Sequence, residues 1–421
     1  MANTLLTWVV ITREALRITH NNIVFAKGVN RQYSKEFAQT GAKIGSTINV
    51  RKPNKYFLRR GTQIQIQGTA ETFVPLTLTT QYGVDTSFSS QDLTLSLDDF
   101  GKRILSPKMS RITSGIDQDG LALVAQVYNN VGIPGVAPGS NNANTGLLTT
   151  NAPQVYLNAG VLMDNFATPR DENRRVIFSP LAQANSVTGL SGLFQDSGSI
   201  AEQYRKGVMG TGLGFEFAMD QNVNIQSTGS RSSSACVVGA ANQAGSTLAI
   251  VASNAATVYP GECFSCANVY SVNPESLQLN PFVQQFAVLP PSNGALYYTA
   301  DSGGNIVLNI SPSIIPPSTP INPLQTVNSI PAGGATLTFS GAANGTTYVN
   351  NIAYHQDAFT FATADLILPG GVDFAAREVY DGISMRIIRA YDITNDLLPD
   401  RIDVLGGWAA LRPEFSCRIW G

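Results

Sequence analysis

The distribution of charge along the chain constrains the fold more than any other feature of the sequence. Residues 221–350 contain four charged side chains, Arg231, Glu262, Glu275 and Asp301, although the whole chain has 27 basic and 29 acidic ones. Within this segment, short runs rich in Val, Ile, Tyr, Phe and Thr alternate with Asn-Gly and Asp-Ser-Gly-Gly turn sequences, which favour tight hairpins. We therefore predict a small antiparallel β domain with its own core, inserted into a host fold.

The strands expected in this inserted domain share a composition rich in β-branched and aromatic residues. They cover residues 247–252, 263–272, 282–289, 295–299, 305–310 and 336–339. An insertion is tolerated where the two ends of the inserted block lie close together. The flanking segments 91–220 and 351–421 should then form one discontinuous body, with the inserted domain bounded at 223–348.

The composition of the chain limits the number of domains and the kinds of protein that it can be. A length of 421 residues suggests two or three domains. Charged residues make up 13%, about half of the usual quarter. A β-rich surface of uncharged polar residues suits proteins that pack against copies of themselves, and it also suits secreted adhesins. The net charge of −2 does not require a nucleic-acid or anionic-membrane partner.

We expect neither a membrane-spanning helix nor an export signal in this sequence. No apolar run approaches the 18 or more residues that a spanning helix needs. The apolar stretch at residues 5–11 has no preceding basic region and no small-residue cleavage site, so we expect no signal peptide. This favours a cytoplasmic site of synthesis.

A basic segment lies near the N-terminus. Residues 37–70 contain no acid, and they carry six cations: Lys43, Arg51, Lys52, Lys55, Arg59 and Arg60. Strand-like alternation at 43–50, 63–67 and 73–79 predicts a long basic hairpin that projects from the body. Its cations could contact phosphates or pair with an acidic face on another subunit.

Helical spacing is expected in several other segments. Residues 4–20 read as an amphipathic helix, and Ser96 with Asp98 and Asp99 has the pattern of a helix start. A long helix is predicted over 110–131, although Gly115 and Gly120 weaken it. A further helix is expected at 154–166, and strands are expected at 175–178, 384–391, 403–405 and 417–420.

The side chains that catalysis needs are not grouped in motifs. The two histidines, His20 and His355, lie far apart, and neither sits in a motif that would hold a base against a nucleophile. His355 is therefore interpreted as a packing or capping residue. The carboxylate pairs Asp98/Asp99 and Asp117/Asp119 are interpreted as helix-start and exposed-helix acids. We expect no enzyme.

Two further motifs are only weak evidence for a phosphate site and a metal site. The run Gly210–Gly214 precedes a strand-like segment rather than a helix, so it lacks the helix N-terminus that binds phosphate. The CxxC at Cys263 and Cys266 has no second pair, as a zinc site would require. We expect these cysteines, with Cys236 and Cys417, to be buried and reduced strand residues. No cofactor and no metal site is predicted.

Several motifs resemble the major capsid proteins of tailed bacteriophages. The resemblance lies in residues 14–17, 22–26, 92–96, 351–359, 381–396, 403–408 and 411–414. The branch that the chain resembles is the coat protein of short-tailed phages, whose Hong Kong-phage capsid fold carries an inserted β domain. The resemblance spans most of the chain, although the insert matches in character more than in motif.

The resemblance implies an α+β capsid fold with a role for each segment. Residues 1–40 would be the N-terminal arm, and 41–88 the extended loop that lies over a neighbouring subunit. Residues 89–222 and 349–421 would form the peripheral and axial core domains. The helix at 110–131 would be the spine helix, and 170–220 with 355–405 would form the axial domain. The insert at 223–348 would be a small antiparallel β-barrel-like domain.

The family also implies candidate contacts between subunits. The cations Arg51, Lys52, Lys55, Arg59 and Arg60 of the loop would face acids on an adjacent subunit's peripheral domain. The candidate acids are Asp98, Asp99, Asp117 and Asp119. Some relatives cross-link a loop lysine to an asparagine, but the resembled branch is not known for that chemistry.

The function implied is a major capsid protein that self-assembles into an icosahedral shell of hexamers and pentamers. Its implied partners are copies of itself, a scaffolding protein, a portal, packaged DNA bound non-specifically on the inner face, and a decoration protein, with no membrane. The expected location is the virion capsid, after assembly in the host cytoplasm. The alternative is a secreted β-rich adhesin or surface-layer protein, and a carbohydrate-active enzyme is a third hypothesis.

Overall fold

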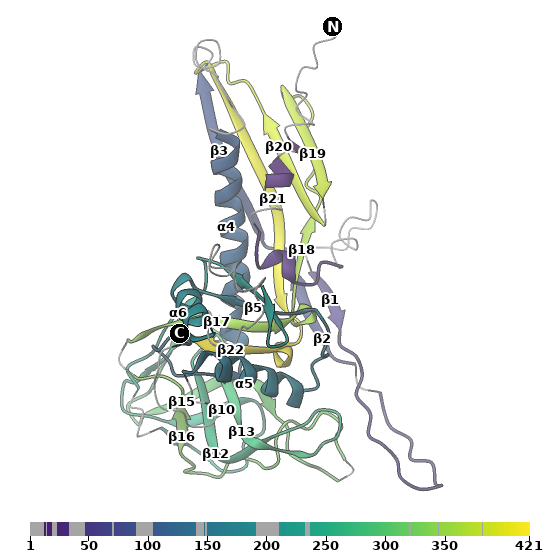
Figure 1. Cartoon of the computed structure of the whole chain (residues 1–421), viewed down its shortest axis with the longest axis vertical. Coiled ribbons are helices and arrows are strands. Elements are labelled where there is room, and N and C mark those ends of the chain that lie inside the picture. The colour runs from purple at the N-terminus through teal and green to yellow at the C-terminus, as the bar shows by residue number, and fades with distance from the viewer. Residues whose placement is uncertain are drawn as a thin grey trace. The chain divides into compact units, whose positions relative to one another are not determined.

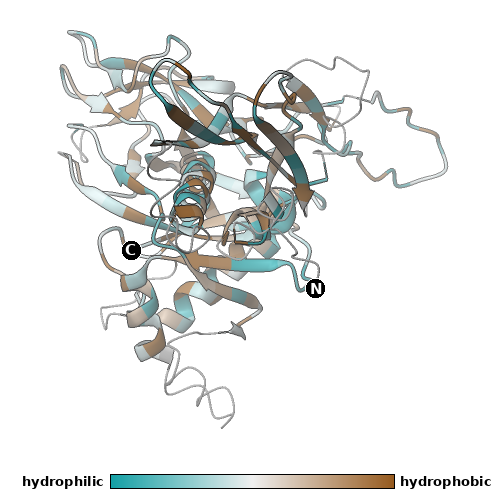
Figure 2. Cartoon of the chain, turned by 90° about the horizontal axis from the view of Figure 1, so that it is seen from above, coloured by the Kyte–Doolittle hydropathy of each residue, from teal (hydrophilic) through white to brown (hydrophobic). Residues whose placement is uncertain are grey.

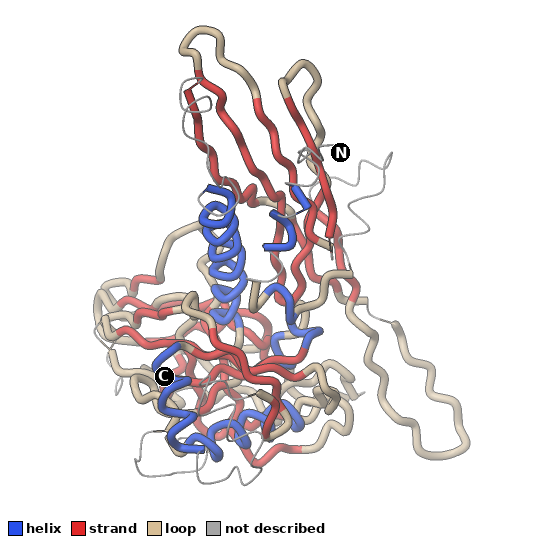
Figure 3. Tube along the Cα trace, turned by 45° about the horizontal axis from the view of Figure 1, so that its top comes forward, coloured by secondary structure: helices blue, strands red, loops and turns tan. Residues whose placement is uncertain are grey.

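A computed structural model describes most of the chain. The described residues are 12–13, 15–18, 23–32, 47–69, 71–89, 104–139, 147, 150–190, 210–231, 236–319, 321–343, 345–380 and 382–421. They form a mixed α+β fold in which strands predominate (Figure 3). Two compact units are present. The first draws on Met1–Arg51, Phe73–Leu121 and Phe359–Leu411, and the second on Lys52–Thr72, Ala122–Ala358 and Arg412–Gly421.

The first unit is an antiparallel sheet with one long helix beside it. The sheet order is β18 (Phe359–Ala364), β21 (Leu397–Ala410), β20 (Ile383–Arg389) and β19 (Phe374–Tyr380), and β3 (Thr80–Ser89) also pairs with β21. Helix α4 (Ser106–Ala122) runs along β3 and β21 (Figure 1). A separate hairpin pairs β1 (Thr47–Arg51) with β2 (Phe73–Thr77). The short 3₁₀ turn η1 (Ala26–Gly28) precedes them.

The contacts of α4 explain one of the two glycines that weaken it as an isolated helix. Gly120 faces the ring of Trp408, and a Cβ there would lie 2.6 Å from Trp408 Cζ2. Glycine is therefore required for the helix to approach β21 this closely. Near the other end of α4, Lys108 Nζ lies 2.5 Å from Asp400 Oδ2, and both side chains are largely buried.

Helix α4 ends earlier than its sequence spacing predicts. The predicted helix at 110–131 is observed as α4 to Ala122, followed by the 3₁₀ turn η3 (Leu123–Gln126) and strand β4 (Asn130–Val131). The carbonyls of Val124 and Val127 accept hydrogen bonds from Arg418 Nη2 at 2.7 and 2.9 Å. Donors from the C-terminus of the chain thus satisfy carbonyl groups at the point where the helix stops.

The second unit contains a mixed sheet with two helices. Its order is β4, β22 (Ser416–Trp420), β17 (Thr347–His355), β5 (Arg174–Phe178), β7 (Phe215–Met219) and β6 (Thr211–Gly212), and β8 (Ile225–Ser227) pairs with β17. The apolar faces of α5 (Ala152–Asn165) and α6 (Pro180–Leu190) supply much of its core, which includes Val155, Tyr156, Ala159, Leu162, Met163 and Ala182. Short 3₁₀ turns η4 (Gln356–Ala358) and η5 (Pro413–Phe415) flank β17 and β22.

A six-stranded antiparallel sheet is built entirely from the charge-poor segment. Its order is β16 (Leu337–Phe339), β12 (Cys263–Val272), β13 (Leu279–Val288), β15 (Asn305–Ile314), β10 (Gly245–Val251) and β9 (Val237–Val238). The two outer strands meet, because Val237 bridges to Thr336 and Val238 N–H donates to Ala335 O at 2.9 Å. The sheet therefore closes into a barrel around a core drawn wholly from residues 236–339. A small ladder of β11 (Thr257–Val258) with β14 (Tyr298–Thr299) accompanies it.

The chain enters and leaves the barrel segment at one place. Strand β8 pairs antiparallel with the start of β17, with Ser227 opposite Thr347 and Ile225 opposite Val349. The expectation that the two ends of the charge-poor block lie close together is confirmed.

Several predicted elements agree with the structure and others do not. The strands at 263–272 and 175–178 and the helix at 154–166 are confirmed as β12, β5 and α5 within a few residues. The run Gly210–Gly214 precedes strand β7, as expected. The predicted helix at 4–20 lies mostly outside the described residues, although 12–13 and 15–18 are helical.

Two further expectations differ from the structure. Residues 63–67 form no strand. The backbone N–H and C=O of Phe57, on the opposite side of the loop, are hydrogen-bonded to the side chain of Gln67 rather than to a strand backbone. The segments expected to form one axial domain, 170–220 and 355–405, are divided between the two compact units, because residues 359–411 belong to the unit that contains α4.

Candidate functional site

The loop between β1 and β2, residues 52–72, is held open by side chains rather than by a backbone ladder. Lys52 N–H donates to Thr72 O at 2.8 Å where the strands end. Beyond that point, Phe57 N–H donates to Gln67 Oε1 at 2.9 Å, and Gln67 Nε2 donates back to Phe57 O at 2.7 Å. At the tip, Arg59 Nη1 donates to the carbonyls of Gly61 and Gln63 at 2.6 and 2.7 Å.

The same loop exposes large apolar side chains. Leu58 is 80% exposed, Ile64 is 82% exposed and Ile66 is 93% exposed. Hydrophobic and hydrophilic residues alternate along the loop (Figure 2). Apolar side chains gathered on a surface mark interaction sites more often than scattered ones do. The alternation of Ile64 and Ile66 with glutamines was present in the sequence, but it was interpreted as a strand.

The predicted cations accompany these apolar residues. The side chains of Arg51, Lys55, Arg59 and Arg60 are exposed, and Lys52 is half-buried. Because exposed guanidinium and ammonium groups attract carboxylates of a partner, the loop presents both charge and apolar area. It has the composition of a contact surface.

The predicted acids have different surroundings. Asp98 and Asp99 lie outside the described residues. Asp119 is exposed and accepts a hydrogen bond from Tyr82 Oη at 2.8 Å. Burial and this carboxylate raise the pKa of Tyr82.

Asp117 is not an exposed acid, so this part of the sequence interpretation was wrong. Its side chain is 1% exposed. It accepts hydrogen bonds from Val24 N–H at 2.8 Å and Ala26 N–H at 3.0 Å. The carboxylate therefore fastens the segment before η1 to α4 within the first unit. The backbone donors come from more than ninety residues upstream, which helix spacing alone cannot reveal.

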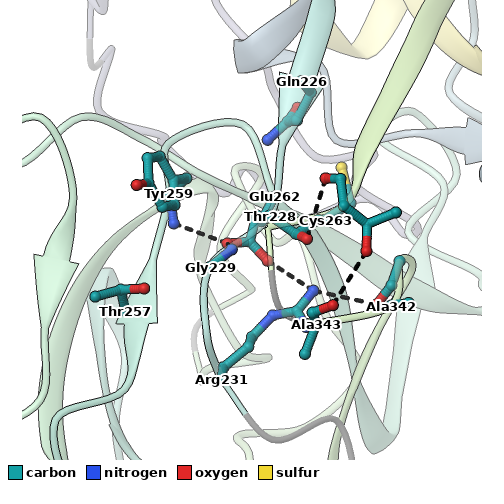
Figure 4. A network of polar contacts seen from close by, with 12 residues as sticks. Gln226, Thr228, Gly229, Arg231, Thr257, Tyr259, Glu262, Cys263, Ala342 and Ala343 are labelled. Atoms are coloured by element: carbon teal, nitrogen blue, oxygen red, sulfur yellow. Dashed lines mark hydrogen bonds and ion pairs between the residues drawn. The ribbon is translucent and has the colours of Figure 1, made fainter.

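A buried polar network lies where the chain passes between the barrel and β17 (Figure 4). Arg231 Nη2 lies 2.6 Å from Glu262 Oε2, and both side chains are 1% exposed. Glu262 Oε1 accepts hydrogen bonds from Gly229 N–H at 2.9 Å and Tyr259 N–H at 2.8 Å. The Arg231 guanidinium stands 4.0 Å from the ring centroid of Phe339.

The charge-poor segment thus places two of its four charged residues against each other in the interior. Burial raises the pKa of Glu262, although Arg231 and the two amide hydrogen bonds act in the opposite direction. Burial likewise lowers the pKa of Arg231, and the Glu262 carboxylate opposes that shift. The sequence showed that these charges are rare, but not that they form a pair.

A second buried arginine extends the network. Arg418, on β22, is 0% exposed. Its Nη1 donates to Gly261 O at 2.6 Å and Gln226 Oε1 at 3.0 Å, while its Nη2 bonds the carbonyls that follow α4. Gln226 also donates to Pro260 O at 3.0 Å. A cation beside carbonyls at the end of a helix is favoured by the helix dipole, and Arg418 therefore joins β22, β8 and the start of β12.

His355 has the capping role predicted for it. It is 2% exposed, and its Nδ1 accepts the Asp357 N–H at 3.2 Å, at the start of η4. Its Nε2 therefore carries the proton and donates to Asp171 Oδ1 at 3.1 Å. His20 lies outside the described residues.

The four cysteines are buried, as expected, and burial raises the pKa of each thiol, that of Cys266 to about 11. Because the thiolate is the nucleophile, we expect the folded chain to resist alkylation at pH 8. All four cysteines should react once the chain is denatured. Mass spectrometry after timed iodoacetamide treatment measures the number of alkylated cysteines in the folded and in the denatured chain. Rapid labelling of Cys263 or Cys266 in the folded chain would contradict this burial.

The chain was compared with protein families, curated proteins and solved structures. No protein-family model matches the chain, and no curated protein does. A structure from Mycobacterium phage Che8 is 11% identical, with a TM-score of 0.47 over 94% of this chain and 90% of that one. A capsid of Ralstonia phage GP4 is 7% identical, with a TM-score of 0.45 over 93% and 86%. The capsid structure of cyanophage P-SCSP1u is 11% identical, with a TM-score of 0.42 over 89% and 83%.

None of the helices in the described part of the chain combines the length and apolar character needed to cross a bilayer.

Proposed function

We propose that this chain is the major capsid protein of a tailed bacteriophage, which self-assembles into a closed shell. The observation that carries the proposal is the loop at 52–72, where exposed Leu58, Ile64 and Ile66 accompany exposed cations. An isolated protein gains nothing from exposing these side chains, whereas burial against another copy removes their apolar area from water. The sequence motifs that resemble capsid proteins point to the same function.

The parts of the capsid fold can be assigned on this proposal. Residues 1–40 are the N-terminal arm and 41–88 the extended loop. Helix α4 is the spine helix of the peripheral domain. Residues 89–222 and 349–421 make up the peripheral and axial core, and 223–348 form the inserted barrel. The pairing of β8 with β17 supports these bounds, because it brings the two ends of the insert together.

The partners follow from the same assignment. Copies of the chain form hexamers and pentamers, a scaffolding protein guides them, and a portal closes the shell. DNA lies against the inner face without sequence preference, and a decoration protein binds outside. The shell is assembled in the host cytoplasm. Low charge suits this role, because broad uncharged contacts avoid the desolvation of isolated ion pairs.

Sedimentation of the purified chain tests the proposal. We expect that analytical ultracentrifugation will show particles many times larger than one subunit as protein concentration rises, with or without a scaffolding protein. A chain that remains monomeric under every assembly condition would show that it is not a shell subunit.

The inserted barrel should fold without the rest of the chain. Its core is drawn from residues 236–339 and its sheet closes on itself. We therefore expect residues 223–348, expressed alone, to unfold cooperatively on heating and to give a dispersed amide spectrum. Both are measured by calorimetry and nuclear magnetic resonance. A disordered fragment would show that the barrel depends on the surrounding unit, for example through Arg418.

A further inference from the structure

A small cavity lies beside the buried pair of Arg231 and Glu262. Its volume is about 10 Å³, which admits about one water-sized sphere. The lining residues come from both ends of the barrel segment and from β22, and they are Gln226, Thr228, Arg231, Glu262, Cys263, Gly341, Tyr348 and Trp420.

Two donors of the pair, Arg231 Nε and Arg231 Nη1, have no hydrogen-bond partner among the described residues. In the same part of the chain, Glu262 Oε2 is contacted by Arg231 Nη2 alone, at 2.6 Å. Arg231 Nη2 donates to Gly341 O at 3.3 Å, and Glu262 Oε1 is occupied by two backbone amides. The pair therefore keeps two unpaired donors on Arg231 and a further lone pair on Glu262 Oε2, on side chains that are 1% exposed (Figure 4).

Leaving such groups unpaired in the interior is costly, especially when they are charged. A buried water molecule typically makes about three hydrogen bonds to polar groups of this kind. The ion pair is already balanced in charge, so a neutral ligand that both donates and accepts fits it better than an ion. We propose that this cavity binds one ordered water molecule, which accepts a hydrogen bond from Arg231 and donates one to Glu262.

The position of the water gives it a structural role. Arg231 follows the segment in which Thr228 N–H donates to Thr346 O at 3.0 Å, beside the pairing of β8 with β17. Glu262 immediately precedes β12, a ten-residue strand of the barrel. The water therefore completes a polar network that fixes the two ends of the barrel segment to the start of β12. This inference rests on the fold alone and does not depend on the proposed function.

A map of the full chain at a resolution that shows ordered water tests the proposal. We expect one peak within hydrogen-bond distance of Arg231 and Glu262, both in ordinary buffer and in buffer without chloride. An empty cavity would overturn the proposal, as would a peak that appears only when chloride is present.

Two variants sharpen the test. Arg231→Lys keeps the positive charge but removes Nε and Nη1, so the peak should disappear. Phe339→Leu changes the ring beneath the guanidinium and leaves all three polar atoms in place, so the peak should remain. Persistence of the peak in Arg231→Lys would overturn the role given to Arg231. If either variant fails to fold, the maps of the unaltered chain in the two buffers still show whether the cavity holds a water molecule.

Discussion

Replacing both Arg59 and Arg60 with Glu should leave the subunit folded and prevent shell assembly. The change turns a loop of four cations and one acid, residues 52–72, into one of two cations and three acids. Each exposed ion pair contributes only on the order of 0.2–1 kcal/mol, but every copy in a closed shell repeats the contact. At each of these contacts, the new glutamates would repel the acids of the adjacent subunit that the arginines attract. Circular dichroism should be unchanged, and ultracentrifugation should show only small species.

The matched control is Arg59→Lys with Arg60→Lys, which keeps both charges and should still assemble, with greater sensitivity to salt. Salt sensitivity is expected because exposed pairs are screened. A double Glu variant that builds normal shells but packages DNA poorly would identify the loop as a nucleic-acid contact instead. That result would contradict the assignment of these residues to a contact between subunits.

Replacing Glu262 with Met should destabilise the chain by about 3–5 kcal/mol, because it leaves the Arg231 charge buried without a partner. The change also removes the acceptor for Gly229 N–H and Tyr259 N–H. Urea denaturation followed by tryptophan fluorescence measures the change in the free energy of unfolding.

Two further variants test whether the stability loss comes from breaking the Arg231–Glu262 pair. The double replacement of Arg231 and Glu262 with Met should be much less destabilising than Glu262→Met alone, because replacing a whole buried pair with apolar residues is often neutral. Glu275→Gln changes an exposed acid of the same segment and should alter stability by less than about 0.5 kcal/mol. If Glu262→Met cost no more than Glu275→Gln, the pair would not be important for stability.

The elements set by local periodicity were predictable from the sequence. Helix α5 has apolar residues at helical spacing, and strand β12 is rich in strand-forming residues between turn sequences. Both were placed within a few residues. The meeting of β8 with β17 followed from the charge-poor composition between them. These features depend on neighbours along the chain, which one sequence shows directly.

The remaining features depend on partners far away in the sequence. Helix α4 ends at Ala122, and Arg418, almost three hundred residues later, bonds the carbonyls of Val124 and Val127 just beyond it. Asp117 looks like an exposed helix acid until the amides of Val24 and Ala26 are placed beside it. The loop carrying Ile64 lacks a strand because the Gln67 side chain separates its two sides. No local pattern encodes these contacts.

A cryo-electron microscopy reconstruction of particles assembled from the purified chain tests the proposed function most directly. We predict a closed icosahedral shell in which residues 58–66 of each subunit lie against a second copy and bury Ile64 and Ile66. Open aggregates, or a shell in which this loop faces solvent and touches no other subunit, would contradict the proposal.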